Sequence, residues 1–459
     1  MSLAPSQPER VGWCPGALRP MRAGDGLLVR VKPRGGRLAP ATLGAIAALA
    51  ERYGNGVLTL TSRANLQLRG VAEKSLPALT DALGALGLLD DTPEAEAVRN
   101  VVSCPFSFPL DAVWNAAAAL EHRLGDDPAS WRLPAKFAWA VDGPGELTLG
   151  PLGADVNVTV TPDGCGVLRL DGDGSAAIVE PHGLAEAATR LADAFLALCA
   201  AHGLVPHRMR DLVAVCGADP VFRRAGLVAT QTSGSLPRPD VIGPYRRAGG
   251  AGIGVAFPFG LLHATTLARV AEIASPPHRA GTDEGLNLAP VPEMRGEARM
   301  RVARPQDPHP TYRAPFADAG AEPMPASVRL TPWRAMLLQG VVDVAALAET
   351  GAIVDPNDPR LGVAACVGAP GCGRASTPVP ADAARLAAVL PAGTGVRLHV
   401  SGCAKGCAHA GPANVTLVGR EGAYDMVLGG RAGDRPARFG LRPADLATML
   451  PSLLEQAGA

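Results

Sequence analysis

The chain has 459 residues, of which 47% are hydrophobic and 19% charged; this composition is typical of a globular protein with a substantial core and excludes a disordered one. The formal net charge is +0, so the whole-molecule field gives no reason to expect nucleic acid or an anionic membrane as a partner. Since no apolar stretch approaches the ~20 residues of a spanning helix and the start lacks a signal-peptide pattern, we expect a cytoplasmic protein.

The N-terminal part alternates strand-like and helix-like patterns. Residues 27–33 predict a strand and 40–53 a helix, followed by strands over 56–61 and 64–70 and an amphipathic helix over 73–88. This β-α-β-β-α order is typical of a ferredoxin-like α+β unit.

The same order recurs in the second half. Residues 252–260 predict a strand and 261–274 a helix, and a Pro- and Arg-rich insertion over 276–326 follows. The next segment, 328–354, aligns with 57–71 without gaps. The matched pairs are Leu60 and Leu330, Thr61 and Thr331, Leu68 and Leu338, Gly70 and Gly340, and Val71 and Val341.

A second pair of segments confirms the internal similarity. Residues 155–164 match 412–422 through Asn157 and Asn414, each followed by Val-Thr. Two distant segments thus recur in the same order. We infer a gene duplication with two pseudo-symmetric α+β halves, whose boundary lies near the Pro-, Gly- and Arg-rich residues 235–250.

Four of the nine cysteines form two Gly-flanked pairs, Cys366 with Cys372 and Cys403 with Cys407. Four thiolates are the ligand set of zinc or of a [4Fe–4S] cluster. Zinc ribbons favour a two-residue spacer, which neither pair has, and the flanking glycines let backbone N–H groups approach cluster sulfides. Buried cysteines acting as small hydrophobes are the remaining alternative. We expect a [4Fe–4S] cluster.

These cysteines, at the end of a duplicated α+β chain, resemble the sulfite/nitrite reductase superfamily. In that superfamily the four cysteines carry a [4Fe–4S] cluster, and the last one, here Cys407, also lies next to a second iron, that of sirohaem. Residues 14–30 and 358–372 most closely resemble the precorrin-3B synthase family within it. The resemblance covers essentially the whole chain.

The resemblance implies an α+β fold with duplicated ferredoxin-like and sulfite reductase-like halves in pseudo-twofold symmetry. It divides the chain into four parts. These are an N-terminal segment with the first ferredoxin-like half-domain (1–95), a first sulfite reductase-like domain (96–245), a second ferredoxin-like half-domain with the insertion (246–355), and a second sulfite reductase-like domain with the cluster (356–459).

A strand with one polar face suggests an anion pocket. Alternation places Arg63, Asn65, Gln67 and Arg69 on one face. A solvated sheet face is the ordinary interpretation, but the matching positions of the second half are largely apolar, which favours a ligand face. Those positions are Trp333, Ala335, Leu337 and Gln339. Further basic candidates are Arg19, Arg22, Arg30, Lys32 and Arg34.

By resemblance, Arg63, Arg99 and Lys136 match cationic positions around the bound anion and sirohaem of sulfite reductases. The chain departs from those enzymes at Ala135 and Ala138, where they carry Arg and Lys. Losing that charge weakens the case for reduction of a small dianion. A pocket for the carboxylate arms of a tetrapyrrole should be rich in arginine.

The resemblance implies a monooxygenase that hydroxylates precorrin-3A at C20 with dioxygen and forms a γ-lactone. Besides the cluster we expect a mononuclear non-haem iron, with sirohaem or haem as the alternative and His409 as a candidate ligand. No convincing dinucleotide-binding Gly-x-Gly-x-x-Gly is found, so NAD(P)H would act through a separate electron donor. The alternatives are a sirohaem-dependent sulfite or nitrite reductase and a non-catalytic tetrapyrrole-binding iron–sulfur protein.

Overall fold

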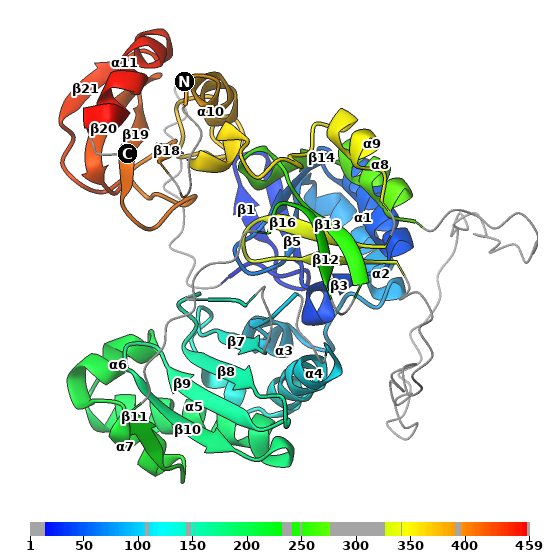
Figure 1. Ribbon diagram of the computed structural model, residues 1–459, viewed down its shortest axis with the longest axis vertical. Coiled ribbons are helices and arrows are strands. Elements are labelled where there is room, and N and C mark those ends of the chain that lie inside the picture. The colour runs from blue at the N-terminus through cyan, green and yellow to red at the C-terminus, as the bar shows by residue number, and fades with distance from the viewer. Residues whose placement is uncertain are drawn as a thin grey trace, which may run out of the picture.

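The computed structural model describes residues 14–105, 110–143, 148–150, 152–231, 241–247, 250–275, 326–340, 342–390, 395 and 397–456. In this part of the chain the strands form four sheets flanked by helices, so the predicted α+β class is confirmed (Figure 1). Among the helices described, none is both long and apolar enough to cross a membrane.

The first sheet is built by the N-terminal pattern and has the order β1-β2-β5-β4-β14. On β5, Leu66 and Leu68 are fully buried in the core and alternate with the polar Gln67 and Arg69. Helix α1 packs against α8 of the second half. The bounds are β1 (Met21–Ala23), β2 (Gly26–Val31), β4 (Val57–Leu60), β5 (Leu66–Val71), β14 (Leu261–His263), α1 (Pro40–Tyr53), α2 (Leu76–Ala85) and α8 (Ala264–Ala274).

The second sheet repeats this plan with the order β12-β13-β16-β15-β3. Leu58 pairs with Leu68 between β4 and β5, and Val328 pairs with Leu338 between β15 and β16, which are the positions that the sequence alignment matches. The duplicated halves are therefore confirmed in the register of the strands. The bounds are β3 (Arg37–Leu38), β12 (Gly243–Arg247), β13 (Gly250–Ala256), β15 (Ser327–Leu330), β16 (Ala335–Gln339) and α9 (Val344–Glu349).

The two halves exchange one short strand each. β3 follows the first-half turn Arg34–Gly36 but pairs with β15, while β14 follows the corresponding turn Pro258–Gly260 and pairs with β4. Each exchange completes the sheet of the other half. The halves are thus joined by backbone hydrogen bonds in a pseudo-twofold arrangement, and the predicted four-domain division stays a prediction.

The remaining two sheets share a second pattern, parallel at one end and antiparallel at the other. β6, β7 and β8 are parallel, as are β17, β18 and β19. Asn157 lies on β8 and Asn414 on β19, in agreement with the second sequence match. The strands are β6 (Val101–Ser103), β7 (Trp139–Asp142), β8 (Val156–Val160), β9 (Gly166–Leu170), β10 (Ser175–Val179), β11 (Ala229–Gln231), β17 (Val363–Ala365), β18 (Leu398–Ser401), β19 (Ala413–Arg420), β20 (Ala423–Gly430) and β21 (Arg438–Leu441).

The C-terminal sheet has a hydrophobic core of its own. Side chains of β17, β18, β19 and the two C-terminal helices form one buried cluster, separate from the core that joins the other three sheets. Figure 1 shows this unit apart from the first sulfite reductase-like unit. The helices are α3 (Pro93–Val98), α4 (Leu110–Asp126), α5 (Leu184–Ala201), α6 (Met209–Cys216) and α7 (Asp219–Arg224) on one unit, and α10 (Val379–Ala387) and α11 (Pro443–Gln456) on the other.

Some predicted elements are wrong at their ends. The strand predicted from residue 64 begins at Leu66, because Ala64 has a left-handed φ of 53° within a turn. The helix predicted over 73–88 is a 3-10 turn, Glu73–Ser75, followed by α2, in whose first turn Pro77 lies.

The exchange of strands corrects two more boundaries. Residues 261–263 form β14 and not the start of a helix, and the strand predicted over 252–260 ends at Ala256 before a 3-10 turn. Local patterning could not reveal a partner strand in the other half. Residues 276–325 of the predicted insertion lie outside the described residues.

Candidate functional site

Two cysteine-bearing loops leave the same edge of the C-terminal sheet. β17 and β18 are parallel neighbours, with Ala365 opposite Val400. Cys366 follows β17 directly and Cys403 lies just beyond β18. Because the carboxyl ends of neighbouring parallel strands meet at one edge, both loops begin side by side. The Gly402 N–H donates a hydrogen bond to Cys366 Sγ at 3.2 Å.

The four thiols affect one another electrostatically. Burial raises the pKa of the Cys366 thiol, and the neighbouring thiols of Cys372 and Cys403 raise it further. Burial also raises the pKa of Cys407, with contributions from the other three thiols. Neighbouring thiols thus oppose the ionisation of Cys366 and Cys407, and a bound cationic core would favour the thiolate form.

Glycines let the two loops approach their surroundings. A Cβ at Gly402 would lie 2.5 Å from the Ala375 side chain, and a Cβ at Gly368 would lie 2.6 Å from Val379 N. Gly406, between the last two cysteines, has a φ of +62°. The segment from Cys403 to Cys407 forms turns and not a helix. These close approaches therefore need residues without side chains.

The donor set fits an iron–sulfur cluster. Over the described ranges, no three His, Cys, Asp or Glu side chains converge within reach of one metal ion. Four thiols on two Gly-rich loops, one of them already accepting a backbone N–H, are the donors that a [4Fe–4S] cluster takes. Cys366, Cys372, Cys403 and Cys407 would hold it.

Arg69 joins the first sheet to the first cysteine loop. Its Nε and Nη2 donate to the Asp25 carboxylate at 3.0 Å each, and Nη2 also donates to the Gly371 carbonyl at 2.6 Å. Gly371 immediately precedes Cys372. Arg69 is only 5% exposed. Strand β5 is thus tied to the loop by a charged hydrogen bond, although the sequence predicts Arg69 as a tetrapyrrole contact.

The polar face of the first sheet is centred on Arg30 and Gln67, which lie opposite each other on β2 and β5. With the Gln67 amide oxygen turned toward Arg30, it accepts from Nε at 3.0 Å and from Nη2 at 2.7 Å. Thr59 is the cross-strand neighbour of Gln67 on β4, and its hydroxyl has no hydrogen-bond partner among the described residues. Burial lowers the pKa of Arg30, and the Cys14 thiol raises it.

Arg63 and Asn65 lie in the turn before β5 and not on the strand. Arg63 Nη2 donates to the carbonyl oxygen of Lys136 at 3.0 Å, while its buried Nη1 has no hydrogen-bond partner in the described part of the chain. Burial lowers the pKa of Arg63. Asn65 is buried, and the Lys136 side chain is exposed. The structure thus brings Arg63 and Lys136 together from segments 73 residues apart in the sequence.

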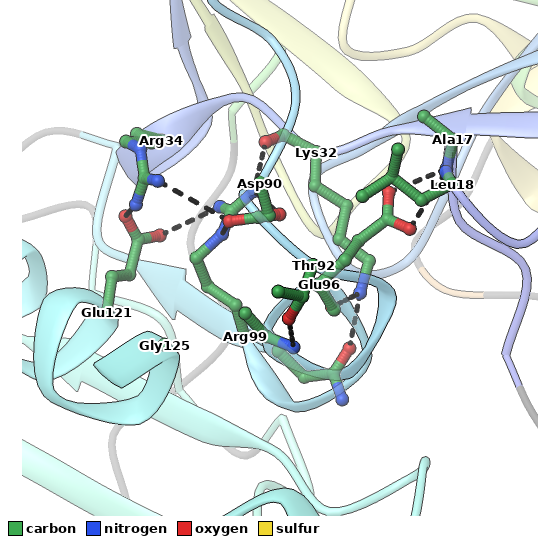
Figure 2. Close-up of polar contacts among 12 residues, drawn as sticks. Ala17, Leu18, Lys32, Arg34, Asp90, Thr92, Glu96, Arg99, Glu121 and Gly125 are labelled. Carbon is green, nitrogen blue, oxygen red and sulfur yellow. Dashed lines mark hydrogen bonds and ion pairs between the residues drawn. The ribbon is translucent and has the colours of Figure 1, made fainter. Parts of the chain in front are cut away.

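Arg99 takes part in a different cluster (Figure 2). It donates from Nε and Nη2 to Asp90 at 2.7 and 2.8 Å, and Nη2 also donates to the carbonyl of Lys32 at 2.9 Å. Its Nη1 lies 3.5 Å from the buried Glu121. Nearby carboxylates raise the pKa of Arg99 despite the opposing effect of burial. These contacts connect α3, α4 and β2, and a tetrapyrrole contact for Arg99 stays a prediction.

Lys32 is the second buried cation of this cluster. Its Nζ donates to Glu96 O at 2.6 Å and to Asn100 Oδ1 at 3.2 Å. Burial lowers the pKa of Lys32 to about 7. The Glu96 carboxylate in turn accepts from Ala17 N at 2.6 Å, which anchors the segment before β1 (Figure 2).

His409 lies in the loop that returns from Cys407 to β19. Its Nε2 is 3.1 Å from the Pro412 carbonyl, and its ring packs edge-on against His399, with centroids 5.8 Å apart. Arg334 reaches the same loop and donates to the Ala408 carbonyl at 3.0 Å. The sequence analysis misses His399 and Arg334. Only the repeat, which aligns Arg334 with Ala64, offers a signal for the latter.

The departures at Ala135 and Ala138 lie beside Arg63. Ala138 is buried, and its N–H donates to Asp155 at 2.9 Å. Asp155 also accepts from Arg208 Nε at 2.9 Å. The position that carries a lysine in sulfite reductases is therefore occupied by a small residue packed against an internal ion pair.

Comparison with known proteins agrees with this geometry. Residues 19–86 match the nitrite/sulfite reductase ferredoxin-like half domain. The chain is 30% identical over 448 residues to a precorrin-3B synthase of Sinorhizobium sp., covering 94% of this chain and 85% of that protein. The chain belongs to the precorrin-3B synthase family. This confirms the resemblance seen in the cysteine motif, and the family is one of oxidoreductase enzymes.

More distant relatives share the superfamily and the fold. A ferredoxin–nitrite reductase of Synechococcus elongatus is 29% identical over 144 residues, 29% of this chain and 28% of that protein. The structure of the Mycobacterium tuberculosis NirA protein superposes with a TM-score of 0.62 at 18% identity, covering 92% of this chain and 79% of that one. The precorrin-3B synthase family therefore shares the nitrite/sulfite reductase architecture.

The Arg69 contacts predict a local effect of Arg69→Gln. Without its ion pair and its bond to Gly371, the loop around residues 366–375 should exchange backbone amide hydrogens faster, by about tenfold for a loss of roughly 1.4 kcal/mol of local stability. Hydrogen–deuterium exchange with mass spectrometry measures this.

Arg208→Gln is the matched control for that prediction. Arg208 also binds an aspartate and a glycine carbonyl, Asp155 and Gly153, the latter at 2.6 Å. Its loss should leave exchange in residues 366–375 unchanged. Equal exchange in this loop for Arg69→Gln and wild type would contradict the assignment of Arg69 to the loop.

The buried Lys32 predicts a pH-dependent stability. In the unfolded chain its ammonium stays protonated up to about pH 10, whereas in the folded protein it loses its proton as the pH rises through about 7. Relative to Lys32→Met, the wild-type free energy of unfolding should therefore rise by about 1.4 kcal/mol per pH unit above neutrality.

Urea unfolding of both proteins at about pH 6 and about pH 9 measures this difference. Lys74→Met, at an exposed lysine, is the control and should show no such trend. A difference between wild type and Lys32→Met that stays constant over this range would show that Lys32 keeps its proton in the folded protein.

Proposed function

We propose that this chain is an iron–sulfur monooxygenase of cobalamin biosynthesis that converts precorrin-3A to precorrin-3B. The macrocycle is hydroxylated at C20, and the ring A acetate closes a γ-lactone at C1. One atom of dioxygen enters the product and the other leaves as water, with electrons and protons that come ultimately from NAD(P)H through a separate donor protein. We place the reaction in the cytoplasm.

The observation that carries this proposal is the bond between Arg69 and the Gly371 carbonyl. Arg69 and Gln67 project from the same face of β5. Arg69, which contacts the cysteine loop, is therefore a neighbour of the polar face that Gln67 forms with Arg30. A cluster on the four cysteines would therefore lie close to cationic side chains of the first half. This is the juxtaposition that a tetrapyrrole oxygenase needs.

Arg30 and Arg63 are suited to bind the substrate's carboxylate arms. Both side chains are half-buried, Arg63 Nη1 is fully buried, and neither residue forms an ion pair with a carboxylate of the described residues. A buried cation without an anion is costly, so an anionic ligand is favoured there. Arginine binds carboxylates through two parallel hydrogen bonds. Asn65, Gln67 and the exposed Lys136 would complete the face, with Arg69 in a positioning role.

The metal centre would rest on residues of the C-terminal sheet. When bound, a [4Fe–4S] cluster would supply electrons one at a time, and a non-haem iron held by residues near Cys407 would supply the chemistry of dioxygen activation. His409 is a candidate ligand of that iron. Its Nε2 faces the Pro412 carbonyl, which leaves Nδ1 for a metal.

The cysteine assignment predicts the metal content. Purified, anaerobically reconstituted protein should hold about four acid-labile sulfide and four cluster iron per chain, with any further iron at the mononuclear site, and Cys403→Ala should lose most of the sulfide and cluster iron. Cys104→Ala is the matched control, because Cys104 follows β6 as Cys366 follows β17. Zinc in place of iron, or equal loss in both variants, would contradict the assignment.

The oxygenase proposal predicts incorporation of one labelled oxygen atom. Full-length protein is mixed with precorrin-3A, reduced under anaerobic conditions and then exposed to ¹⁸O₂. Mass spectrometry should find a single ¹⁸O atom in the product. A product without label would refute the oxygenase proposal and favour a protein that binds the tetrapyrrole without oxidising it. The absorption spectrum separates the reductase alternative, since sirohaem has intense Soret and red bands that an iron–sulfur centre lacks.

The polar face predicts a selective loss of affinity. Arg63→Gln should weaken binding of precorrin-3A by about 10- to 100-fold, the value of one charged hydrogen-bond pair. The exposed Arg22 pairs with Glu73 on the neighbouring surface, so Arg22→Gln is the control and should bind as wild type does. Anaerobic titration of the substrate absorption measures both affinities, and equal values would remove Arg63 from the site.

A further inference from the structure

The loop from Gly402 to Pro412 covers two basic side chains that the proposed reaction has not used, Arg334 and His399. β18 and β19 are parallel, so this loop must cross one face of the sheet. On β18, Leu398 and Val400 point into the C-terminal core. His399 therefore points to the opposite face, beneath the loop that carries Cys403 and Cys407.

His399 is fully buried, and neither of its ring nitrogens has a hydrogen-bond partner among the described residues. A Cβ placed on Gly406 would lie 3.6 Å from His399 Cε1, so the ring packs directly under the residue before Cys407. Burial, with His409 and Arg334 nearby, lowers the pKa of His399 to about 4. In either protonation state the ring keeps at least one N–H to donate, and such a donor is costly to leave unused in a buried site.

Arg334 reaches the loop from the second ferredoxin-like half. It lies in the turn between β15 and β16 with a φ of 59°. This is the left-handed backbone conformation, which residues other than Gly and Asn rarely adopt. Its Nη2 donates to Ala408 O at 3.0 Å, and Nη1 donates to Phe259 O at 3.4 Å. Over the described ranges it forms no ion pair with a carboxylate; burial lowers the pKa of Arg334, and the nearby sulfur of Cys366 raises it.

We propose that Arg334 and His399 are tuning residues beneath the cluster loop, Arg334 as the counter-charge of the cluster and His399 as an N–H donor on its Cys407 side, and that together they raise its reduction potential. The inference rests on the proposed function in that it requires a cluster on the four cysteines. A cluster with four thiolates is anionic, and each electron it accepts adds negative charge. A nearby fixed cation stabilises the reduced form more than the oxidised one.

The sister turn of the first half supports a dedicated role for Arg334. There Ala64 takes the same left-handed conformation, with a φ of 53°. The turn therefore does not need an arginine for its backbone. Arg334 has a longer side chain at the same strained backbone position, and this side chain reaches the Ala408 carbonyl. Residues with a strained backbone conformation cluster at functional sites.

The experiment is a potentiometric titration of the cluster in the reconstituted full-length chain, with dithionite as the one-electron donor and the EPR signal of the reduced cluster as the readout. Arg334→Gln, which keeps a donor but removes the charge, should move the midpoint potential to a more negative value. Arg334→Lys should stay close to wild type. His399→Leu should shift it in the same direction as Arg334→Gln.

Arg360→Gln is the matched control, because it removes a charge that Asp358 already neutralises at 2.6 Å, in the part of the chain that carries the four cysteines. It should keep the wild-type potential. An Arg334→Gln protein with full cluster content and an unchanged potential overturns the inference. If Arg334→Gln does not retain the cluster, Arg334→Lys decides: a wild-type potential supports a role of charge, and a displaced one overturns it. A wild type without any cluster would instead refute the proposed function.

Discussion

The parallel pairing of β17 with β18 is the constraint on which the site depends. It brings Cys366 and Cys403 to one edge of a sheet, where Gly402 can donate its N–H to the Cys366 sulfur. The sheet has its own hydrophobic core, so the loops start from a rigid base. Arg69 then attaches this base to the polar face of the first half. Without this strand pairing, neither the approach of the two cysteine loops nor their link to Arg69 would remain.

Duplication gave both halves the same edge, and only one of them became a thiol site. Cys104 follows β6 as Cys366 follows β17, yet Cys104 is buried and interacts with Asp142. Asp142 ends β7 and accepts from Gly143 N and Leu149 N at 2.9 and 2.8 Å. Asp142 therefore occupies, at the end of β7, the position that Ser401 occupies at the end of β18, two residues before Cys403.

The duplicated α+β fold and the grouping of the four cysteines can be predicted from the sequence because both depend on local patterns. The fold follows from the periodicity of the strands, and the grouping follows from the two Gly-flanked cysteine pairs. Sequence reasoning failed where the partner comes from elsewhere in the chain. Nothing around Leu261 shows that it pairs with β4, and nothing in the alternation around Arg69 shows that Asp25 and Gly371 hold it. Arg99 is predicted as a ligand contact from the family resemblance, and nothing in the sequence shows that the carboxylates that bind it lie on α4 and before α3.

The second half also has a polar sheet face, and there two cations contact an aromatic ring of the chain itself. Arg329 on β15 stacks on Trp114 at 3.9 Å from the ring centroid, and Arg37, on the exchanged strand β3, lies 4.3 Å from the same ring. The indole supplies electron density in place of an anion, although burial still lowers the pKa of Arg329 to about 9. The corresponding positions of the first half are Thr59 and Leu261. The arginines of the first-half face are instead Arg30 on β2 and Arg63 in the turn before β5. What distinguishes the two faces is therefore the source of the counter-charge: an aromatic ring of the protein in one and, under the proposed function, a carboxylate of the substrate in the other.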